Sequence, residues 1–271
     1  MKLGVIAGNR LSPLIFSKSA KAKDKSLELI GICFYGETNR GISRYVDKTF
    51  WLQAGQLKRL VEIIRKEDLN KLVMVGQISP KRIFDRKYWD DKMLRLAEDI
   101  EDFRPHTLFS RLIRTLEILG VEFLDSTMYM KDYLAAEGIM NDLEITSEIQ
   151  DDIDFGTEIA SKFVELDIGQ CIVVKKKTPV ALEGLEGTDR TIIRAYRLAG
   201  AGCIVLKFSK KDQDLRFDVP IVGLNTLKLL RRIKASVLVL EKDRVIILEK
   251  EKFLRLSHIW GIPIIGKSKI G

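Results

Sequence analysis

The densest group of polar side chains runs from Asp212 to Pro220 and reads Asp-Gln-Asp-Leu-Arg-Phe-Asp-Val-Pro. Three residues separate it from the preceding apolar run Cys203–Phe208. If this segment is extended, Asp214, Arg216 and Asp218 share one face, because side chains alternate along an extended chain. Two carboxylates beside an arginine suit a divalent cation and a phosphoryl group. The alternative is an exposed loop whose Asp–Arg pair contributes little to stability.

A second polar segment, residues 183–189, reads Glu-Gly-Leu-Glu-Gly-Thr-Asp. Its two glycines permit tight turns of the backbone, and Thr188 is expected to cap a helix that runs to about Ala199. The first turn of such a helix presents unpaired N–H groups, which can bind a phosphate. The alternative is an ordinary junction between a strand, a turn and a capped helix.

Two shorter segments follow predicted strands near the N-terminus. Residues 7–13 read Ala-Gly-Asn-Arg-Leu-Ser-Pro and stand where nucleotide-binding loops begin, but Arg10 and Pro13 break the full glycine fingerprint. Residues 76–80 read Gly-Gln-Ile-Ser-Pro and again follow a strand. Each segment is also explained, more simply, as a turn that ends a strand.

The net charge indicates anionic partners. The chain carries 46 lysines and arginines against 38 acidic residues, which gives a net charge of +8 and a pI of about 9.3. A nucleotide, a nucleic acid or an anionic membrane surface would suit this balance. The basic residues are nevertheless spread along the chain, Lys175–Lys177 is the only tight triplet, and no aromatic residues alternate with them. Nucleic-acid binding is therefore not favoured.

The apolar runs are of strand length and fall far short of the roughly 20 residues that a membrane span needs. The segment Met1–Gly8 lacks the long apolar region of a secretory signal and reads as a first buried strand. We therefore expect a cytoplasmic protein, with peripheral attachment to the inner face of the cytoplasmic membrane as an alternative.

The cysteines and histidines match no metal-binding or catalytic spacing. Cys33, Cys171 and Cys203 are scattered, and each stands in an apolar run, which is typical of a small buried hydrophobic residue. His106 and His258 are far apart in the sequence, and we predict a structural role for His258.

The elements that must position these residues fall into two halves. The first alternates strands, predicted at residues 3–7, 27–34, 72–75 and 121–124, with helices predicted to about residue 25 and at 56–66, 91–101 and 110–119. Such alternation predicts a parallel sheet covered by helices, and a Rossmann-like domain is the simplest interpretation.

The second half has a different pattern. We predict a helix at 145–166, two strands around the turn 175–178, helices at 188–199, 224–234 and 250–260, strands at 203–208 and 263–265, and a hairpin at 236–248. The fold class is therefore α/β, with a Rossmann-like N-terminal domain at 1–130, a linker at 131–141 and a second α/β domain at 142–271. A ligand cleft between the two domains is expected.

Taken together, the motifs resemble the LpxI family of UDP-2,3-diacylglucosamine pyrophosphatases. The strongest matches are residues 213–220 with Gly223, 186–189 and 166–170; weaker ones are Ala7-Gly8, 55–57, Val75-Gly76 with Pro80, Glu137-Gly138 and 264–266. Their order and spacing match from residue 3 to residue 266. The family usually has a glycine run where Asn9 and Arg10 stand here.

The resemblance implies a hydrolase that depends on Mg²⁺, with Mn²⁺ as an alternative ion. It would cleave UDP-2,3-diacylglucosamine to UMP and 2,3-diacylglucosamine 1-phosphate (lipid X), a step of lipid A biosynthesis. It also implies a homodimer, a UDP-sugar-binding N-terminal domain and a catalytic C-terminal domain.

The resemblance also assigns roles to residues. Asp218 and Asp214 would be catalytic, and Asp218, Asp214 and Asp189 would hold the metal. The expected substrate-binding residues are Gly8, Asn9, Leu11, Gly76, Gln77, Gln170, Gly187, Thr188, Lys207, Gln213 and Arg216.

Two other functions compete with the hydrolase. The first is a non-catalytic nucleotide-sugar-binding or scaffold protein of the same fold. The enzyme is favoured over it, because the chain retains Asp218, Asp214 and Asp189. The second is a nicotinamide-dependent oxidoreductase. The sequence argues against it because the glycine fingerprint is incomplete and no acidic residue closes the second strand, where Glu37 comes late.

Overall fold

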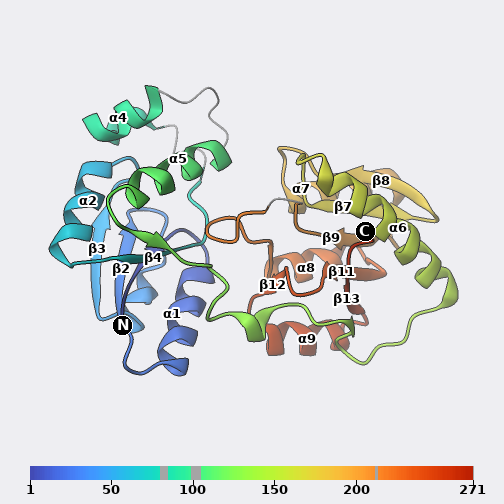
Figure 1. Ribbon diagram of the computed structural model, residues 1–271. Helices are drawn as coiled ribbons and strands as arrows, with labels where there is room; N and C mark the ends of the chain where they lie inside the picture. Colours follow the sequence, from blue (N-terminus) through green and yellow to red (C-terminus); the bar gives the residue numbers. More distant parts are fainter. Residues whose placement is uncertain (80–84, 99–104, 211–212, 271) are drawn as a thin grey trace. The chain divides into compact units, whose positions relative to one another are not determined.

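The computed structural model describes residues 1–79, 85–98, 105–210 and 213–270, and it divides into two compact units. The first unit consists of Met1–Met130 together with Asp214–Asp218, and the second of Lys131–Gln213 and Val219–Gly271. The chain therefore passes from one unit to the other after Met130, after Gln213 and after Asp218. Each unit has its own main sheet (Figure 1).

The first unit contains a parallel sheet of five strands in the order β3-β2-β1-β4-β5. Its elements are β1 (Lys2–Ala7), α1 (Ser12–Lys23), β2 (Glu28–Phe34), η1 (Arg40–Arg44), β3 (Lys48–Leu52), α2 (Leu57–Lys66), β4 (Lys71–Val75), η2 (Arg86–Tyr88), α4 (Asp91–Glu98), α5 (Pro105–Glu117) and β5 (Glu122–Phe123). This strand order is that of a Rossmann-like sheet, so the predicted fold class is confirmed.

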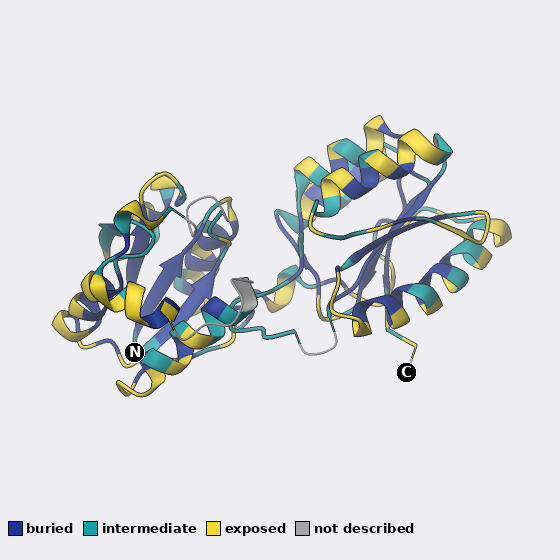
Figure 2. Ribbon diagram, turned by 90° about the horizontal axis from the view of Figure 1, so that it is seen from above, coloured by how far each residue is buried: buried dark blue, intermediate teal, exposed yellow. Residues whose placement is uncertain are grey.

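The core of the first unit follows from its hydrophobic pattern. Leu57, Leu60, Val61 and Ile64 recur at helical spacing and are buried in a cluster that joins α2, α4 and α5 to one face of the sheet. Helix α1 covers the opposite face (Figure 1). The strands form the buried layer, and the helices turn their exposed sides outward (Figure 2). Strand β3, at the edge of the sheet, was not predicted, and only Leu52 of its five residues is fully buried.

The second unit contains a mixed sheet of six strands in the order β6-β13-β11-β9-β7-β8, and β10 and β12 form a small parallel pair. Its elements are η3 (Lys131–Tyr133), β6 (Gly138–Ile139), α6 (Ser147–Glu165), β7 (Cys171–Lys175), β8 (Thr178–Leu182), α7 (Thr188–Ala199), β9 (Ile204–Lys207), β10 (Ile221–Val222), α8 (Leu224–Arg232), β11 (Val237–Glu241), β12 (Ile246–Ile247), α9 (Lys250–Ile259) and β13 (Ile264–Lys267). Helix α6 packs on one face of the sheet, and α7, α8 and α9 pack on the other.

Two features of the second unit differ from the prediction. The hairpin expected at 236–248 is absent from these described residues: β11 is buried between β9 and β13 and runs parallel to both, and β12 pairs with β10 instead. A strand buried on both faces shows no alternation that would separate it from a hairpin strand. The segment 131–141, expected as a linker, carries β6, which pairs antiparallel with β13.

Candidate functional site

In the first unit, the loops after β1 and β4 lie backbone to backbone. The strand order reverses between these two strands, which is where open α/β sheets bind ligands. Gly8 N donates to Val75 O (2.8 Å), and Asn9 N donates to Gln77 O (2.6 Å). A β-carbon on Gly8 would lie 2.4 Å from Gln77 O, so only glycine fits. Four predicted residues, Gly8, Asn9, Gly76 and Gln77, are thus brought together.

Glu37 joins this edge of the sheet, although its late position in the sequence argued against such a role. Its carboxylate accepts hydrogen bonds from Asn9 Nδ2 (2.8 Å), Ser79 N (3.1 Å) and Ser79 Oγ (2.5 Å). The turn after β2 brings it there, because Thr38 N donates to Phe34 O (3.0 Å) and Thr38 Oγ1 donates to Ala7 O. The signal in the sequence was a lone acid three residues beyond a buried strand.

The bond from Glu37 sets which way the Asn9 amide faces. A carboxylate only accepts hydrogen bonds, so Asn9 must turn its Nδ2 toward Glu37 and its Oδ1 away. Asn9 Oδ1 is buried and has no hydrogen-bond partner among the residues that the structure describes. A buried acceptor without a donor costs about 1–3 kcal/mol. Since the Gly8 and Asn9 N–H groups are already used, this edge suits a ligand's hydroxyl or N–H group better than a phosphate.

Leu11 takes part in none of the hydrogen bonds described above. It is the residue before α1, it is 39% exposed, and it makes no side-chain cap. Its role in substrate binding stays a prediction.

In the second unit, a buried lysine stands beside the start of α7. Lys207 ends β9, is 7% exposed and donates from Nζ to Thr188 Oγ1 (2.7 Å). Thr188 Oγ1 in turn donates to Glu183 Oε1 (3.1 Å). Thr188 therefore does not cap α7, contrary to the prediction, because its hydroxyl is used by these two neighbours. The N-cap is Gly187, with φ of 81° and no side-chain bond.

This arrangement favours an anion. The first N–H groups of α7 have no side-chain cap, and a helix N-terminus attracts negative charge. Lys207 forms no ion pair with any residue that the structure describes, and an unpaired buried ammonium is costly. A phosphoryl group at the start of α7 would satisfy both the helix and the lysine.

Two glutamines extend the same group. Gln170 N donates to Glu183 Oε2 (3.2 Å), and Gln170 Nε2 donates to Gln213 Oε1 (3.2 Å). Gln213 Oε1 also accepts from Lys210 N (2.8 Å), so its Nε2 faces the other way, where it is buried and has no partner in the described part of the chain. Four predicted binding residues, Gln170, Thr188, Lys207 and Gln213, thus belong to one hydrogen-bonded group.

The acid Glu186 has a structural role in the predicted segment 183–189. Its carboxylate accepts from Arg194 Nη2 (2.5 Å) and from Gly184 N (3.0 Å). These hydrogen bonds, above all the one from Arg194, lower the pKa of Glu186 to about 2. They stabilise the turn that leads into α7.

Glu241 is a further buried acid that sequence reasoning missed. It ends β11, is 6% exposed, and accepts from Ser209 N and Ser209 Oγ (2.5 Å each). Lys269 Nζ lies 3.2 Å from its second oxygen. These contacts fix the start of the loop that follows β9. The sequence did contain a signal for this residue, because Glu241 is a charged residue directly after the apolar run 237–240.

The segment Asp214–Asp218 forms a turn, so the condition of an extended chain, under which Asp214, Arg216 and Asp218 would share one face, is not met. Phe217 N and Asp218 N both donate to Asp214 O (3.2 and 2.9 Å), and Arg216 N donates to Asp214 Oδ1 (3.0 Å). Aspartate favours such turns because its carboxylate binds the backbone two residues on. Asp212, where the predicted segment began, lies outside the described residues.

Within this turn, Asp214 and Arg216 are paired with each other. Arg216 Nη2 lies 2.8 Å from Asp214 Oδ2, and Arg216 Nε lies 3.0 Å from Asp214 Oδ1. Arg216 Nη1 also donates to Glu117 Oε1 (2.8 Å). The hydrogen bonds to Asp214 raise the pKa of Arg216 above its usual range. Both side chains therefore hold the turn.

The three predicted metal ligands do not form a ready-made cage in the described residues. Asp214 and Asp218 belong to the first unit, whereas Asp189 belongs to the second, where it accepts from Thr226 Oγ1 (3.3 Å). No group of three or more His, Cys, Asp or Glu side chains that could hold a metal occurs among the residues searched. Mg²⁺ is commonly held by only one or two carboxylates plus substrate phosphates, so a cage of three protein carboxylates is not required, and the metal-binding role of these residues stays a prediction.

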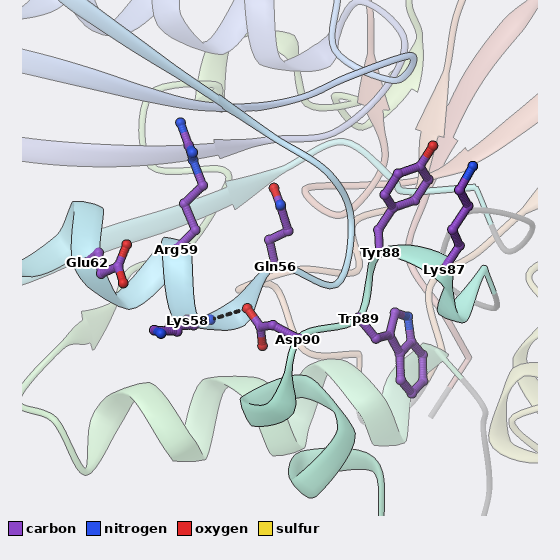
Figure 3. A pocket seen from close by; sticks show the side chains of 8 residues that line it. All are labelled: Gln56, Lys58, Arg59, Glu62, Lys87, Tyr88, Trp89 and Asp90. Atoms are coloured by element: carbon purple, nitrogen blue, oxygen red, sulfur yellow. Dashed lines mark hydrogen bonds between the residues drawn. The ribbon is translucent and has the colours of Figure 1, made fainter.

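An open hollow of about 440 Å³ lies on the first unit (Figure 3). It is lined by Gln56, Lys58, Arg59, Glu62, Lys87, Tyr88, Trp89 and Asp90. Asp90 bridges the starts of two helices, because it accepts from Lys58 N (2.6 Å) in α2 and from Met93 N (3.0 Å) in α4. The hollow is lined by both acidic and basic side chains, and none of the predicted site residues lines it. It is a surface hollow and not the candidate site.

The described histidine side chain and the three cysteines take no part in these polar groups. His258 Nδ1 bonds to Asn141 O (2.8 Å), and the side chain of His106 lies outside the described part. The three cysteines are free and buried, and burial raises the pKa of Cys33 to about 12. The predicted roles of His258 and the cysteines are confirmed.

The fold and these polar groups define a two-unit α/β protein with a Rossmann-like first unit and hydrogen-bonding groups at the carboxyl edges of its sheets. The model of the LpxI N-terminal domain matches residues 2–133, and that of the LpxI C-terminal domain matches residues 136–265. The chain belongs to the LpxI family.

One curated relative is the UDP-2,3-diacylglucosamine pyrophosphatase LpxI of Caulobacter vibrioides. It is 22% identical over 277 residues, which cover 98% of this chain and 97% of the relative. No described helix is both long and apolar enough to cross a membrane.

Solved structures offer only a loose likeness. A glycinamide-RNase-transformylase T from Mycobacterium tuberculosis is 13% identical, with a TM-score of 0.25 over 68% of this chain and 44% of that one. The biotin carboxylase domain of the Hydrogenobacter thermophilus 2-oxoglutarate carboxylase is 12% identical, with a TM-score of 0.28 over 73% and 41%. The chain spans less than half the length of these structures, and they carry no argument about function.

Proposed function

We propose that this protein hydrolyses the pyrophosphate of UDP-2,3-diacylglucosamine to UMP and 2,3-diacylglucosamine 1-phosphate in lipid A biosynthesis. Its membership of the LpxI family and the name of its Caulobacter relative support the substrate. The observation that carries the chemistry is the buried Lys207 beside the uncapped start of α7, next to the unpartnered N–H of Gln213.

Pyrophosphate hydrolysis needs neutralised charge, a positioned water and a stabilised leaving phosphate. In our proposal, Lys207, Gln213 Nε2 and the first N–H groups of α7, after Gly187, bind phosphoryl oxygens. Asp218 accepts a hydrogen bond from the attacking water and orients it. Asp214 supports Asp218 through the turn that they share.

Mg²⁺, or Mn²⁺ in its place, would neutralise phosphoryl charge when bound, with Asp218 as its main protein ligand and Asp189 as a second acid. In the first unit, Asn9 Oδ1 would accept a hydrogen bond from an uncharged N–H or O–H group of the nucleoside or sugar. Gly8 and Gly76 keep the two loops of that edge close enough to form it. The protein would act in the cytoplasm as a homodimer.

The experiment measures UMP release from UDP-2,3-diacylglucosamine with and without Mg²⁺. We expect divalent-ion-dependent turnover, which Asp218→Ala lowers at least about a hundredfold while UMP binding persists. Asp214→Ala should lower turnover less than Asp218→Ala does, because Asp214 acts only by shaping the turn that carries Asp218. Asp243→Ala, which removes an acid from an exposed turn after β11, serves as the control.

A second candidate function is a non-catalytic nucleotide-sugar-binding or scaffold protein. Folded protein that binds the lipid without turnover under any divalent ion would favour it. Asp218→Ala with near wild-type turnover would refute the role given to Asp218.

A further inference from the structure

We infer that Ser126, Glu117 and Phe109 are positioning residues that hold Asp218 on the first unit, although Asp218 lies in the C-terminal half of the sequence. The inference rests on the proposed function, because it takes Asp218 as the catalytic acid. The structure groups Asp214–Asp218 with Met1–Met130 and not with the sequence on either side of them.

The first contact is made to the Leu215 carbonyl. Ser126 donates to Leu215 O twice, from its backbone N (3.0 Å) and from its Oγ (2.5 Å). Ser126 is 4% exposed, so water does not compete with these bonds. A backbone carbonyl that receives two buried donors is firmly fixed.

Ser126 is itself held in place by the sheet. Leu124 N donates to Leu72 O (2.8 Å), which continues the pairing of β5 with β4. Asp125 then starts a turn, because its Oδ1 accepts from Thr127 N (2.6 Å) and Thr127 Oγ1 (2.7 Å). The donors of Ser126 are therefore a rigid extension of the parallel sheet.

The next two residues of the turn make the second and third contacts. Arg216 Nη1 bonds to Glu117 Oε1 at the end of α5 (2.8 Å). The Phe217 ring lies 5.9 Å from the Phe109 ring, also on α5, and packs against the core of the first unit. An aromatic pair of this kind contributes about 0.5–1.5 kcal/mol beyond its buried area.

Three successive residues are thus anchored immediately before Asp218, whose own N–H bonds to Asp214 O (2.9 Å). The backbone of Asp218 consequently keeps its place relative to β4, β5 and α5. A displacement of about 1 Å at a reacting group costs on the order of a hundredfold in rate, so these anchors matter for turnover.

The test compares Ser126→Ala and Phe109→Ala with Ser161→Ala. Ser161 is a matched control, because it is a buried serine of the second unit, 6% exposed, that donates to Thr157 O (2.8 Å) and accepts from Ile270 N (3.0 Å). Hydrogen–deuterium exchange of the amides at residues 216–218 reports anchoring without any need for turnover. UMP release reports its consequence.

We expect exchange at residues 216–218 to rise about fivefold or more in both anchor variants and to stay unchanged in Ser161→Ala. We expect kcat to fall at least about tenfold in the anchor variants, with KM within about twofold. Glu117→Gln keeps an acceptor for Arg216 and should retain more activity than Glu117→Leu.

Unchanged exchange at residues 216–218 in both anchor variants would overturn the inference whatever the activity. So would faster exchange with kcat equal to that of Ser161→Ala, since the contacts would then only stabilise the fold. An inactive wild-type protein with the expected exchange would instead contradict the proposed function and leave the anchoring supported.

Discussion

At the scale of single residues, the two most informative side chains are buried amides. In each of them, one hydrogen-bonding atom has no partner among the described residues. Asn9 presents an acceptor in the first unit, and Gln213 presents a donor in the second. In each case a hydrogen bond at the other end of the amide fixes its direction, from Asn9 to Glu37 and from Gln170 to Gln213. Proteins rarely leave such atoms unpaired, which is why both point to a ligand.

Lys207→Met tests whether the buried Lys207 binds a phosphoryl group. Lys207→Met keeps the length of the side chain and removes the buried charge. We expect UMP release to fall at least about tenfold, mainly through a higher KM, because a phosphoryl contact is lost. Thermal unfolding should stay the same or shift upward, because a buried cation without an ion pair destabilises the fold.

Lys250→Met supplies the contrast. Lys250 Nζ donates to Leu134 O (2.5 Å) and Asp132 O (3.2 Å), and burial lowers the pKa of this lysine. Its loss should lower the melting temperature without changing turnover. If Lys207→Met is destabilised and fully active, Lys207 is a structural residue and not a phosphate ligand.

At the scale of elements, the backbones of the loops after β1 and β4 are in direct contact. This contact is possible because Gly8 has no side chain to hold the two loops apart. Gly8→Ala tests this arrangement. Its β-carbon would lie 2.4 Å from Gln77 O, so the loops must part. We expect unfolding to become easier by about 1–3 kcal/mol, together with weaker UMP binding, as measured by denaturant titration and calorimetry.

Gly120→Ala is the control for Gly8→Ala, because it strains the backbone without a steric clash. Gly120 has a φ of +85°, but a β-carbon there would meet nothing within 4 Å. This control should cost about 1 kcal/mol of stability and leave UMP binding intact. Equal effects of the two substitutions on binding would argue against a role for the paired loops.

At the scale of the whole molecule, the +8 charge predicts peripheral binding to a membrane. We expect co-sedimentation with anionic phospholipid vesicles at low salt and release as salt rises, because the screening length falls from about 10 Å at 0.1 M to about 3 Å at 1 M. Vesicles of neutral phosphatidylcholine are the control. Binding that is equal on both lipids, or that persists at high salt, would contradict an electrostatic attachment.

The sequence by itself determined most of the elements and the family. Hydrophobic periodicity is a local property, so α2, α6 and α7 were predicted close to their observed bounds, and the order of motifs identified the LpxI family. The glycines of the first loops were also visible, because each marks a place where only a bare backbone fits.

Only the tertiary structure decided which of these residues meet. Strand order placed Glu37 beside Asn9, and it separated β11 from β12, which the sequence had joined in a hairpin. The Asp214 carboxylate folded its segment into a turn, and Ser126 bound that turn to the first unit. The Asp214 turn is local, but the bond from Asn9 to Glu37 joins residues 28 positions apart and the bond from Ser126 to Leu215 joins residues 89 positions apart. Such long-range pairings depend on how strands are ordered and loops are closed, and local sequence patterns carry no information about that.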